Sequence, residues 1–166
     1  VVGKGADAPL RQGYGGIIWA TEKFQAKHKC IIAVPQYPDV ILDDHGSYTM
    51  TDYIRHTENL VRALIAGFKI DPDRVYATGQ SMGCMTFLYL AAQRPDLFAA
   101  EIFVSGQWDI RQLEGLKYQK FFYITAEGDQ KASTGQKAVM KMFKESHVPF
   151  SSAIGWDAKK SQEDFT

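Results

Sequence analysis

Cysteine and histidine are scarce in this sequence, with two and four copies in 166 residues. The cysteines, Cys30 and Cys84, both adjoin apolar residues, and no Cys/His group has the spacing of a zinc site. We therefore expect no structural metal and no disulfide. Both thiols are predicted to be buried apolar groups.

Excess charge of one sign and long apolar stretches are also missing. Nineteen Lys and Arg residues balance nineteen Asp and Glu residues, so the charge favours neither a nucleic acid nor an anionic membrane as a partner. No apolar run approaches the ~20 residues that cross a bilayer, and there is no N-terminal signal pattern. The sequence thus predicts neither a membrane span nor a nucleic-acid partner.

What the chain does contain is an alternation of strand and helix patterns. Hydrophobic residues make up 45% and charged residues 23%, which suits a single globular domain over residues 1–166. The patterns predict strands at 30–34, 74–78, 102–104, 120–125 and 149–154, and helices at 17–27, 51–68, 84–94 and 133–145. Such alternation indicates an α/β fold with a mostly parallel, doubly wound sheet and helices on both faces.

Two local details refine these expectations. The apolar run at 30–34 is typical of a strand buried on both faces of a parallel sheet. Ser133 and Gln136 form a capping-box pattern, which predicts the start of the last long helix. In an open sheet of this kind, ligands bind beyond the carboxyl ends of the strands.

A Gly-x-Ser-x-Gly motif, formed by Gly79, Ser81 and Gly83, joins a predicted strand to a predicted helix. A tight turn of this kind holds its serine in strained backbone geometry and presents the hydroxyl above the sheet edge. The start of the following helix aims backbone N–H groups at a developing oxyanion, so the amide of Met82 is the candidate donor. The motif predicts a serine nucleophile.

Residues 1–8 superficially fit the Gly-x-Gly-x-x-Ala fingerprint of dinucleotide-binding proteins. That fingerprint needs a full strand before it and a helix directly after it. Here only two valines precede the glycines and Pro9 follows, so we expect no dinucleotide or other organic cofactor.

Three stretches carry a family resemblance: IDPDRVYATGQSMG at 70–83, RPDLFAA at 94–100 and EGD at 127–129. On these residues the chain resembles the α/β-hydrolases, and among them the serine esterases related to polyhydroxybutyrate depolymerases and feruloyl esterases. Peptidases of the prolyl-oligopeptidase type are similar as well, so the resemblance leaves the acyl group open. Similar esterases are often exported, which favours an extracellular location slightly and leaves the compartment open.

The resemblance implies catalytic residues in the order serine, acid, histidine. Asp129 follows the second strand after the serine and matches the acid, while Asp109, after the preceding strand, is the alternative. The acid would orient a histidine and stabilise the imidazolium that forms as Ser81 loses its proton.

The histidine is the missing part of this set. The resemblance places it after the strand at 149–154, yet the last histidine of the chain is His147. A helix of ~13 residues would carry His147 ~20 Å from Asp129, to the opposite edge of the sheet. Only His45 lies in a loop at the correct edge, as a weak alternative base. We expect residues 1–166 to be a portion of a larger catalytic domain, lacking its first strands and the histidine loop.

Four residues near the carboxyl ends of predicted strands are candidates for substrate binding: Gln80, Gln107, Trp108 and Tyr37. The leading hypothesis is a serine carboxylesterase that forms an acyl-enzyme on Ser81 and takes a small or polymer-linked ester, with no metal. A serine peptidase or an acyltransferase would use the same residues. An inactive hydrolase-like binding protein is the third hypothesis, and exposed apolar sheet edges would favour a homo-oligomer.

Overall fold

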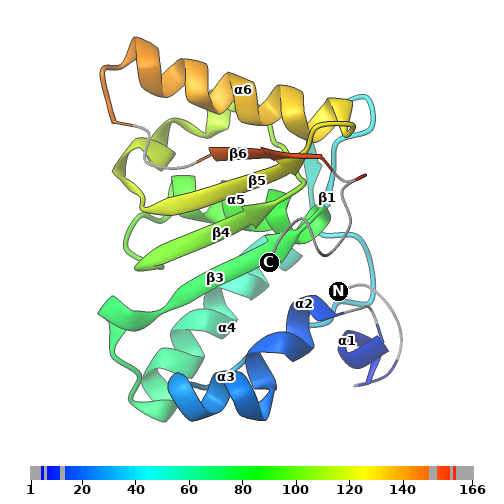
Figure 1. Cartoon of the computed structure of the whole chain (residues 1–166). Helices are drawn as coiled ribbons and strands as arrows, with labels where there is room; N and C mark the ends of the chain where they lie inside the picture. Colours follow the sequence, from blue (N-terminus) through cyan, green and yellow to red (C-terminus); the bar gives the residue numbers. More distant parts are fainter. Residues whose placement is uncertain (1–4, 6, 12–13, 150–152, 158, 160–166) are drawn as a thin grey trace.

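The computed structural model describes residues 5, 7–11, 14–149, 153–157 and 159 (Figure 1). The α-helices are α1 (Ala8–Arg11), α2 (Tyr14–Ile17), α3 (Glu22–Lys27), α4 (Tyr53–Phe68), α5 (Met82–Gln93) and α6 (Gln130–Glu145). The 3₁₀ helices are η1 (Ile18–Ala20), η2 (Pro72–Arg74), η3 (Ile110–Gln112) and η4 (Glu114–Tyr118). The strands are β1 (Leu42–Asp43), β2 (Thr49–Met50), β3 (Tyr76–Gln80), β4 (Ala100–Val104), β5 (Phe121–Ala126) and β6 (Ala153–Trp156).

Within the described residues, four parallel strands form the main sheet in the order β3-β4-β5-β6. The register aligns Gln80 with Val104 and Val104 with Ile124, so the carboxyl ends of these strands lie at one edge. β1 and β2 form a separate antiparallel hairpin. The parallel sheet predicted from the alternation of strands and helices is confirmed.

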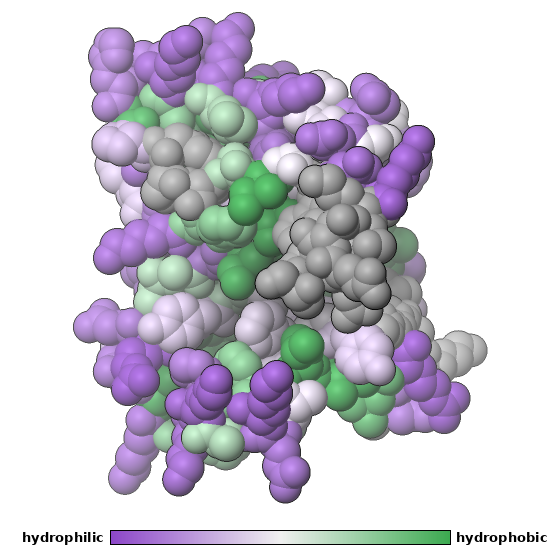
Figure 2. Space-filling model, in the orientation of Figure 1, coloured by the Kyte–Doolittle hydropathy of each residue, from purple (hydrophilic) through white to green (hydrophobic). Residues whose placement is uncertain are grey.

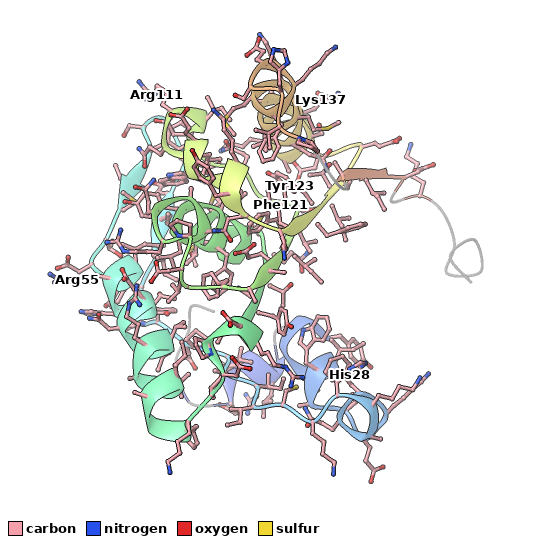
Figure 3. The ribbon with its side chains drawn as sticks, turned by 90° about the vertical axis from the view of Figure 1, so that its left-hand side faces the viewer. His28, Arg55, Arg111, Phe121, Tyr123 and Lys137 are labelled. Carbon is pink, nitrogen blue, oxygen red and sulfur yellow. The ribbon has the colours of Figure 1, made fainter. Side chains whose placement is uncertain are left out.

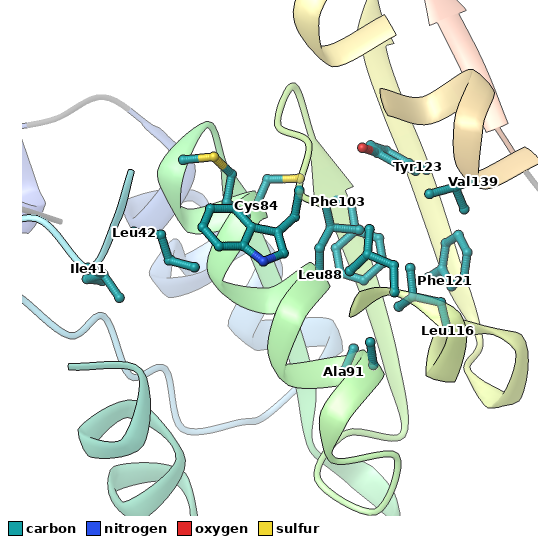
Figure 4. Packing of buried hydrophobic residues seen from close by; sticks show 14 of the residues in the cluster. Ile41, Leu42, Cys84, Leu88, Ala91, Phe103, Leu116, Phe121, Tyr123 and Val139 are labelled. Carbon is teal, nitrogen blue, oxygen red and sulfur yellow. The ribbon is translucent and has the colours of Figure 1, made fainter. Parts of the chain in front are cut away.

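Helices lie on both faces of this sheet. On one face the hydrophobic core joins Leu88 of α5 and Val139 of α6 to Phe103 of β4 and Phe121 of β5 (Figure 4). Helix α4 contacts α5 on this side, and in Figure 3 α3 lies on the other side of β3 from α4. The doubly wound arrangement therefore agrees with the prediction.

The second face of the sheet is less completely covered. Along β5, Phe121 and Tyr123 are buried, whereas Phe122 and Ile124 on the alternate positions are half-buried. Figure 2 shows apolar side chains gathered in the middle of this face. This period of two is what a strand shows when its two faces differ in burial.

Most predicted elements lie within two residues of the observed ones. The helices at 51–68 and 84–94 correspond to α4 and α5, and the strands at 74–78, 102–104 and 120–125 correspond to β3, β4 and β5. The last predicted strand overlaps β6, although 150–152 lie outside the described residues, as do 1–4 and 6 of the dinucleotide-like stretch.

The strand predicted at 30–34 is wrong, because the structure has no strand there. Cys30 is exposed and Ile31 is 54% exposed, so the predicted burial of Cys30 is wrong as well. β3 ends the described sheet and pairs only with β4 within it. A strand requires a neighbouring backbone to satisfy its hydrogen bonds, and an apolar run does not reveal whether that neighbour is present.

Cys84, in contrast, is buried in the core, as predicted. Both thiols are free in this structure. Burial raises the pKa of the Cys84 thiol to about 12. The thiol is therefore protonated at neutral pH and packs as an apolar group.

Two helix boundaries differ from the prediction. The helix expected at 17–27 is interrupted after η1, where Thr21 caps α3 and its side chain accepts a hydrogen bond from the amide of Phe24. Helix α6 begins at Gln130 with Asp129 as its cap, so Ser133 is a buried residue inside the helix. Several residue types can cap a helix, and the strand before α6 determines which one reaches the free amides.

An acidic side chain is buried within the sheet. Glu101 on β4 is 3% exposed, and neither of its carboxylate oxygens has a hydrogen-bond partner among the described residues. This burial raises the pKa of Glu101 to about 8, because a charged carboxylate loses its hydration there.

Among the described helices, none combines the length and apolar character that crossing a bilayer requires.

Candidate active site

Ser81 is the single residue between β3 and α5. Its backbone has φ 53° and ψ −121°, a conformation that costs a residue with a Cβ about 1–3 kcal/mol. The surrounding structure holds this conformation. The Ser81 amide donates to the Val104 carbonyl at 3.0 Å, and the Ser81 carbonyl accepts from the Met85 amide at 3.0 Å. The chain therefore makes a tight strand-to-helix turn at the Gly-x-Ser-x-Gly motif.

The two glycines of the motif have different roles in this turn. A Cβ on Gly79 would lie 2.3 Å from the carbonyl carbon of Gly83 and 2.8 Å from the amide nitrogen of Cys84. A Cβ on Gly83 would meet nothing within 4 Å. Only Gly79 is sterically required, because there the strand passes directly against the backbone of the helix.

The Gly79→Ala variant should therefore lose about 2 kcal/mol or more of its free energy of unfolding, because backbone atoms cannot yield to the new methyl group. Gly83→Ala is the matched control and should be neutral or slightly stabilising, since alanine favours a helix more than glycine does. Urea unfolding of the two variants measures the difference. Equal stability of both would contradict this steric account of the turn.

The side chain of Ser81 is exposed and makes no capping hydrogen bond to α5. The first amides of a helix, here beginning with that of Met82, have no partner within the helix. The N-terminus of a helix also carries a partial positive charge of about half a unit. A negatively charged oxygen beside the Ser81 hydroxyl would therefore be stabilised at this position.

Asp129 lies at the same edge of the sheet, after β5. It is half-buried and caps α6, with its Oδ1 accepting a hydrogen bond from the Ala132 amide at 3.0 Å. One carboxylate oxygen serves this cap, which leaves Oδ2 as the acceptor for another donor. The cap fixes the carboxylate at the start of the helix.

Asp109, the alternative acid, is buried after β4 and is bound by Arg111 through both carboxylate oxygens. The guanidinium group lies 2.7 Å from Oδ2. Hydrogen bonds from Arg111 hold the pKa of Asp109 below its usual value. Because Arg111 already occupies this carboxylate, the geometry favours Asp129 over Asp109 as a partner for a histidine.

The histidines are spread over the molecule. His28 follows α3, His56 lies within α4 and His147 follows α6 at the end opposite to Asp129, and all three are exposed. His45 lies in the loop between β1 and β2, with its side chain 85% exposed. Its Nδ1 lies 2.7 Å from Oδ1 of Asp43.

The four candidate substrate-binding residues divide into one exposed and three buried side chains. Gln80 is exposed at the end of β3. Trp108 is 3% exposed and its indole donates to Gln112, while the buried Tyr37 lies 2.6 Å from the Thr57 hydroxyl. Trp108 and Tyr37 thus pack in the core, and Gln80 is the candidate directly beside Ser81.

Gln107 belongs to a polar network that the sequence did not reveal. Its amide nitrogen donates to Oδ2 of Asp44 at 2.6 Å, and its amide oxygen accepts from the Tyr48 hydroxyl at 3.1 Å. Lys131 lies 2.7 Å from the same Oδ2 of Asp44. Burial opposes ionisation of Asp44, yet the hydrogen bonds from Lys131 and Gln107 hold its pKa below the usual value. No local sequence pattern indicates the partners of Asp44, because they lie far from it in the chain.

Asp43, Asp44 and His45 offer ligand atoms that all lie within 4.8 Å of one another, as those of a metal site would. Asp44 is already paired with Lys131, and Asp43 holds the imidazole of His45. These pairings account for the close approach of the three side chains without a cation.

The parallel sheet, the helices on both of its faces and the serine turn define the α/β-hydrolase fold. A solved structure described as a thermostable esterase matches with a TM-score of 0.76 and 23% sequence identity. The match covers 91% of this chain and 42% of that chain. At this identity the likeness establishes the fold alone.

The prolyl oligopeptidase family matches over residues 17–154. The chain therefore belongs to the prolyl oligopeptidase family, and its resemblance to α/β-hydrolases is confirmed. A protein of Nocardia uniformis subsp. tsuyamanensis named "Putative esterase NocK" is 48% identical over 48 residues, which are 29% of this chain and 14% of that protein. The chain thus spans less than half the length of either matched protein.

Proposed function

We propose that Ser81 is the nucleophile of a serine hydrolase, and more narrowly of a carboxylesterase. The observation that carries the proposal is the turn at Ser81, which holds an exposed hydroxyl at the N-terminus of α5. The family match and the relative named as an esterase support hydrolytic chemistry.

In the proposed reaction, Ser81 Oγ attacks the carbonyl carbon of an ester. The C–O bond to the alcohol then breaks, leaving an acyl group on the serine that water hydrolyses. The Met82 amide stabilises the oxyanion in both steps. Asp129 orients the histidine that takes the serine proton and returns it to the leaving alcohol. Gln80 borders the substrate, which is a small or polymer-linked ester.

We further propose that this histidine comes from a segment outside residues 1–166. His28 and His56 lie on or beside helices, and His147 lies at the far end of α6 from Asp129. His45 is held by Asp43 in an exposed loop. A solved structure of the same fold is more than twice as long as the part that this chain matches, which leaves room for such a segment.

Exposure of the full-length protein to a fluorophosphonate probe, followed by mass spectrometry, tests this function. An activated serine attacks the phosphorus atom, displaces fluoride and forms one stable adduct, which we expect on Ser81. Heat-denatured protein is the control and should remain unlabelled. No adduct, or an adduct on another serine, would overturn the assignment and favour an inactive binding protein.

A serine peptidase is the second candidate, and the family match specifically favours it. Amide and ester hydrolysis require the same nucleophile, acid and base, so the site geometry does not separate them. Initial rates on a panel of p-nitrophenyl esters and peptide anilides do separate them. We expect ester hydrolysis to be faster, and faster anilide hydrolysis would assign the protein as a peptidase.

A further inference from the structure

The hairpin at residues 42–50, formed by β1, β2 and the loop between them, has a fixed base and a polar tip. Leu42 and the preceding Ile41 are buried in the core with residues of α5 (Figure 4). The loop lies at the carboxyl edge of the sheet beside the start of α6 (Figure 1). Since its base is packed and its tip projects, contacts at the tip determine where the loop rests.

Those contacts converge on Asp44, whose side chain is 9% exposed. Lys131 Nζ lies 2.7 Å from its Oδ2 and donates to its backbone carbonyl at 3.3 Å, while Gln107 donates to Oδ2 at 2.6 Å. We call these three residues the Asp44 clamp. Tyr48 reinforces the clamp, because its hydroxyl donates to Gln107 and its ring packs edge-on against Trp108 at 5.0 Å.

Both anchors of the clamp adjoin the candidate catalytic residues. Gln107 follows Gly106, and a Cβ on Gly106 would lie 2.6 Å from the carbonyl oxygen of Ser81. Lys131 lies in the first turn of α6, which Asp129 caps. The hairpin is therefore tied to the two segments that border the proposed nucleophile and its acid.

We propose that the hairpin at 42–50 is the wall that sets the size of ester accepted at Ser81, with the Asp44 clamp as its positioning device. This inference rests on the proposed function of Ser81. The clamp holds the wall against the carboxyl edge and so limits the room for a long acyl chain. Releasing the wall admits larger esters, while Ser81 and its turn remain unchanged.

The test compares kcat and KM for p-nitrophenyl acetate and p-nitrophenyl decanoate in the full-length protein. In Lys131→Met, the preference for acetate over decanoate should fall about tenfold, mainly through a lower KM for decanoate. Lys137→Met is the matched control, because Lys137 projects into solvent from the same helix (Figure 3) and should leave the preference unchanged. Lys131→Arg retains a cation beside Asp44 and should keep the preference of the wild-type protein.

A second perturbation reaches the clamp without removing a charge. A Cβ on Gly135 would lie 2.2 Å from the Cβ of Gln107, so Gly135→Ala should displace Gln107. Like Lys131→Met, this variant should show a weaker preference for acetate over decanoate. If Lys131→Met changed kcat/KM equally for both esters, or did not change it at all, the proposal that the hairpin limits ester size would be wrong.

Fluorophosphonate labelling of the wild-type protein separates the two proposals. If Ser81 is labelled and the variants keep the wild-type preference for acetate over decanoate, only the proposed role of the hairpin is wrong. An unlabelled Ser81 removes the proposed function and, with it, this inference.

Discussion

Ser81→Ala should lower ester hydrolysis by the full-length protein by several orders of magnitude and leave the fold intact. The hydroxyl is the only group that the substitution removes, and it makes no capping hydrogen bond to α5. Removal of a nucleophile from a triad leaves only the slower catalysis by binding and the oxyanion site. Initial rates on p-nitrophenyl acetate, with circular dichroism as the check of folding, measure the effect.

Ser105 provides a matched control for this substitution. It follows β4 as Ser81 follows β3, and its φ of 45° is also in the left-handed region. Ser105→Ala should keep hydrolysis within about tenfold of the wild-type rate, because Ser105 precedes no helix N-terminus. A Ser81→Ala protein that hydrolyses the ester at the wild-type rate would exclude Ser81 from the reaction.

The second large effect concerns stability and pH, through Glu101. The pKa of Glu101 is about 8 in the folded protein, whereas the pKa of an ordinary glutamate is 4.5. At a pH between these two pKa values, Glu101 is ionised in the unfolded chain and protonated in the folded protein. The free energy of unfolding should therefore fall as pH rises from 4.5 to 8, by about 1.4 kcal/mol per pH unit from this group.

Glu101→Gln should remove this slope, because an amide of similar shape does not titrate. At pH 7 the variant should be more stable than the wild-type protein by roughly 2–5 kcal/mol. Urea unfolding between pH 5 and pH 8 measures both slopes, with the exposed Glu22→Gln as the control. Parallel slopes for the wild-type protein and Glu101→Gln would show that Glu101 is not held protonated by the fold.

The sequence alone predicted the parts of the fold that local rules determine. The Gly-x-Ser-x-Gly motif defined the strand, the turn and the helix at Ser81, because each of them constrains its immediate neighbours. The strand at 120–125 and the helix at 84–94 were likewise predicted from the residues of each element alone. These features required no knowledge of distant contacts.

Features that depend on distant partners were not predictable. The run at 30–34 looked like a buried strand, but a strand also needs a partner strand, and no strand of the described sheet pairs with these residues. The bond between Gln107 and Asp44 joins residues 63 positions apart, and that between Lys131 and Asp44 joins residues 87 positions apart. Only the folded structure shows that the Asp44 side chain is bound by the ammonium group of Lys131 and the side-chain amide of Gln107.

The order of the strands also bears on how the protein forms during synthesis. Each of β4, β5 and β6 joins the strand that precedes it in the chain, so the sheet can grow in one direction as the polypeptide leaves the ribosome. The turn at Ser81 is complete once β4 supplies the Val104 carbonyl, whereas Asp44 must wait for Lys131. A nascent chain that ends after β4 therefore contains both partners of the hydrogen bond between Ser81 and Val104. It does not yet contain Lys131, so the ion pair that holds Asp44 cannot form.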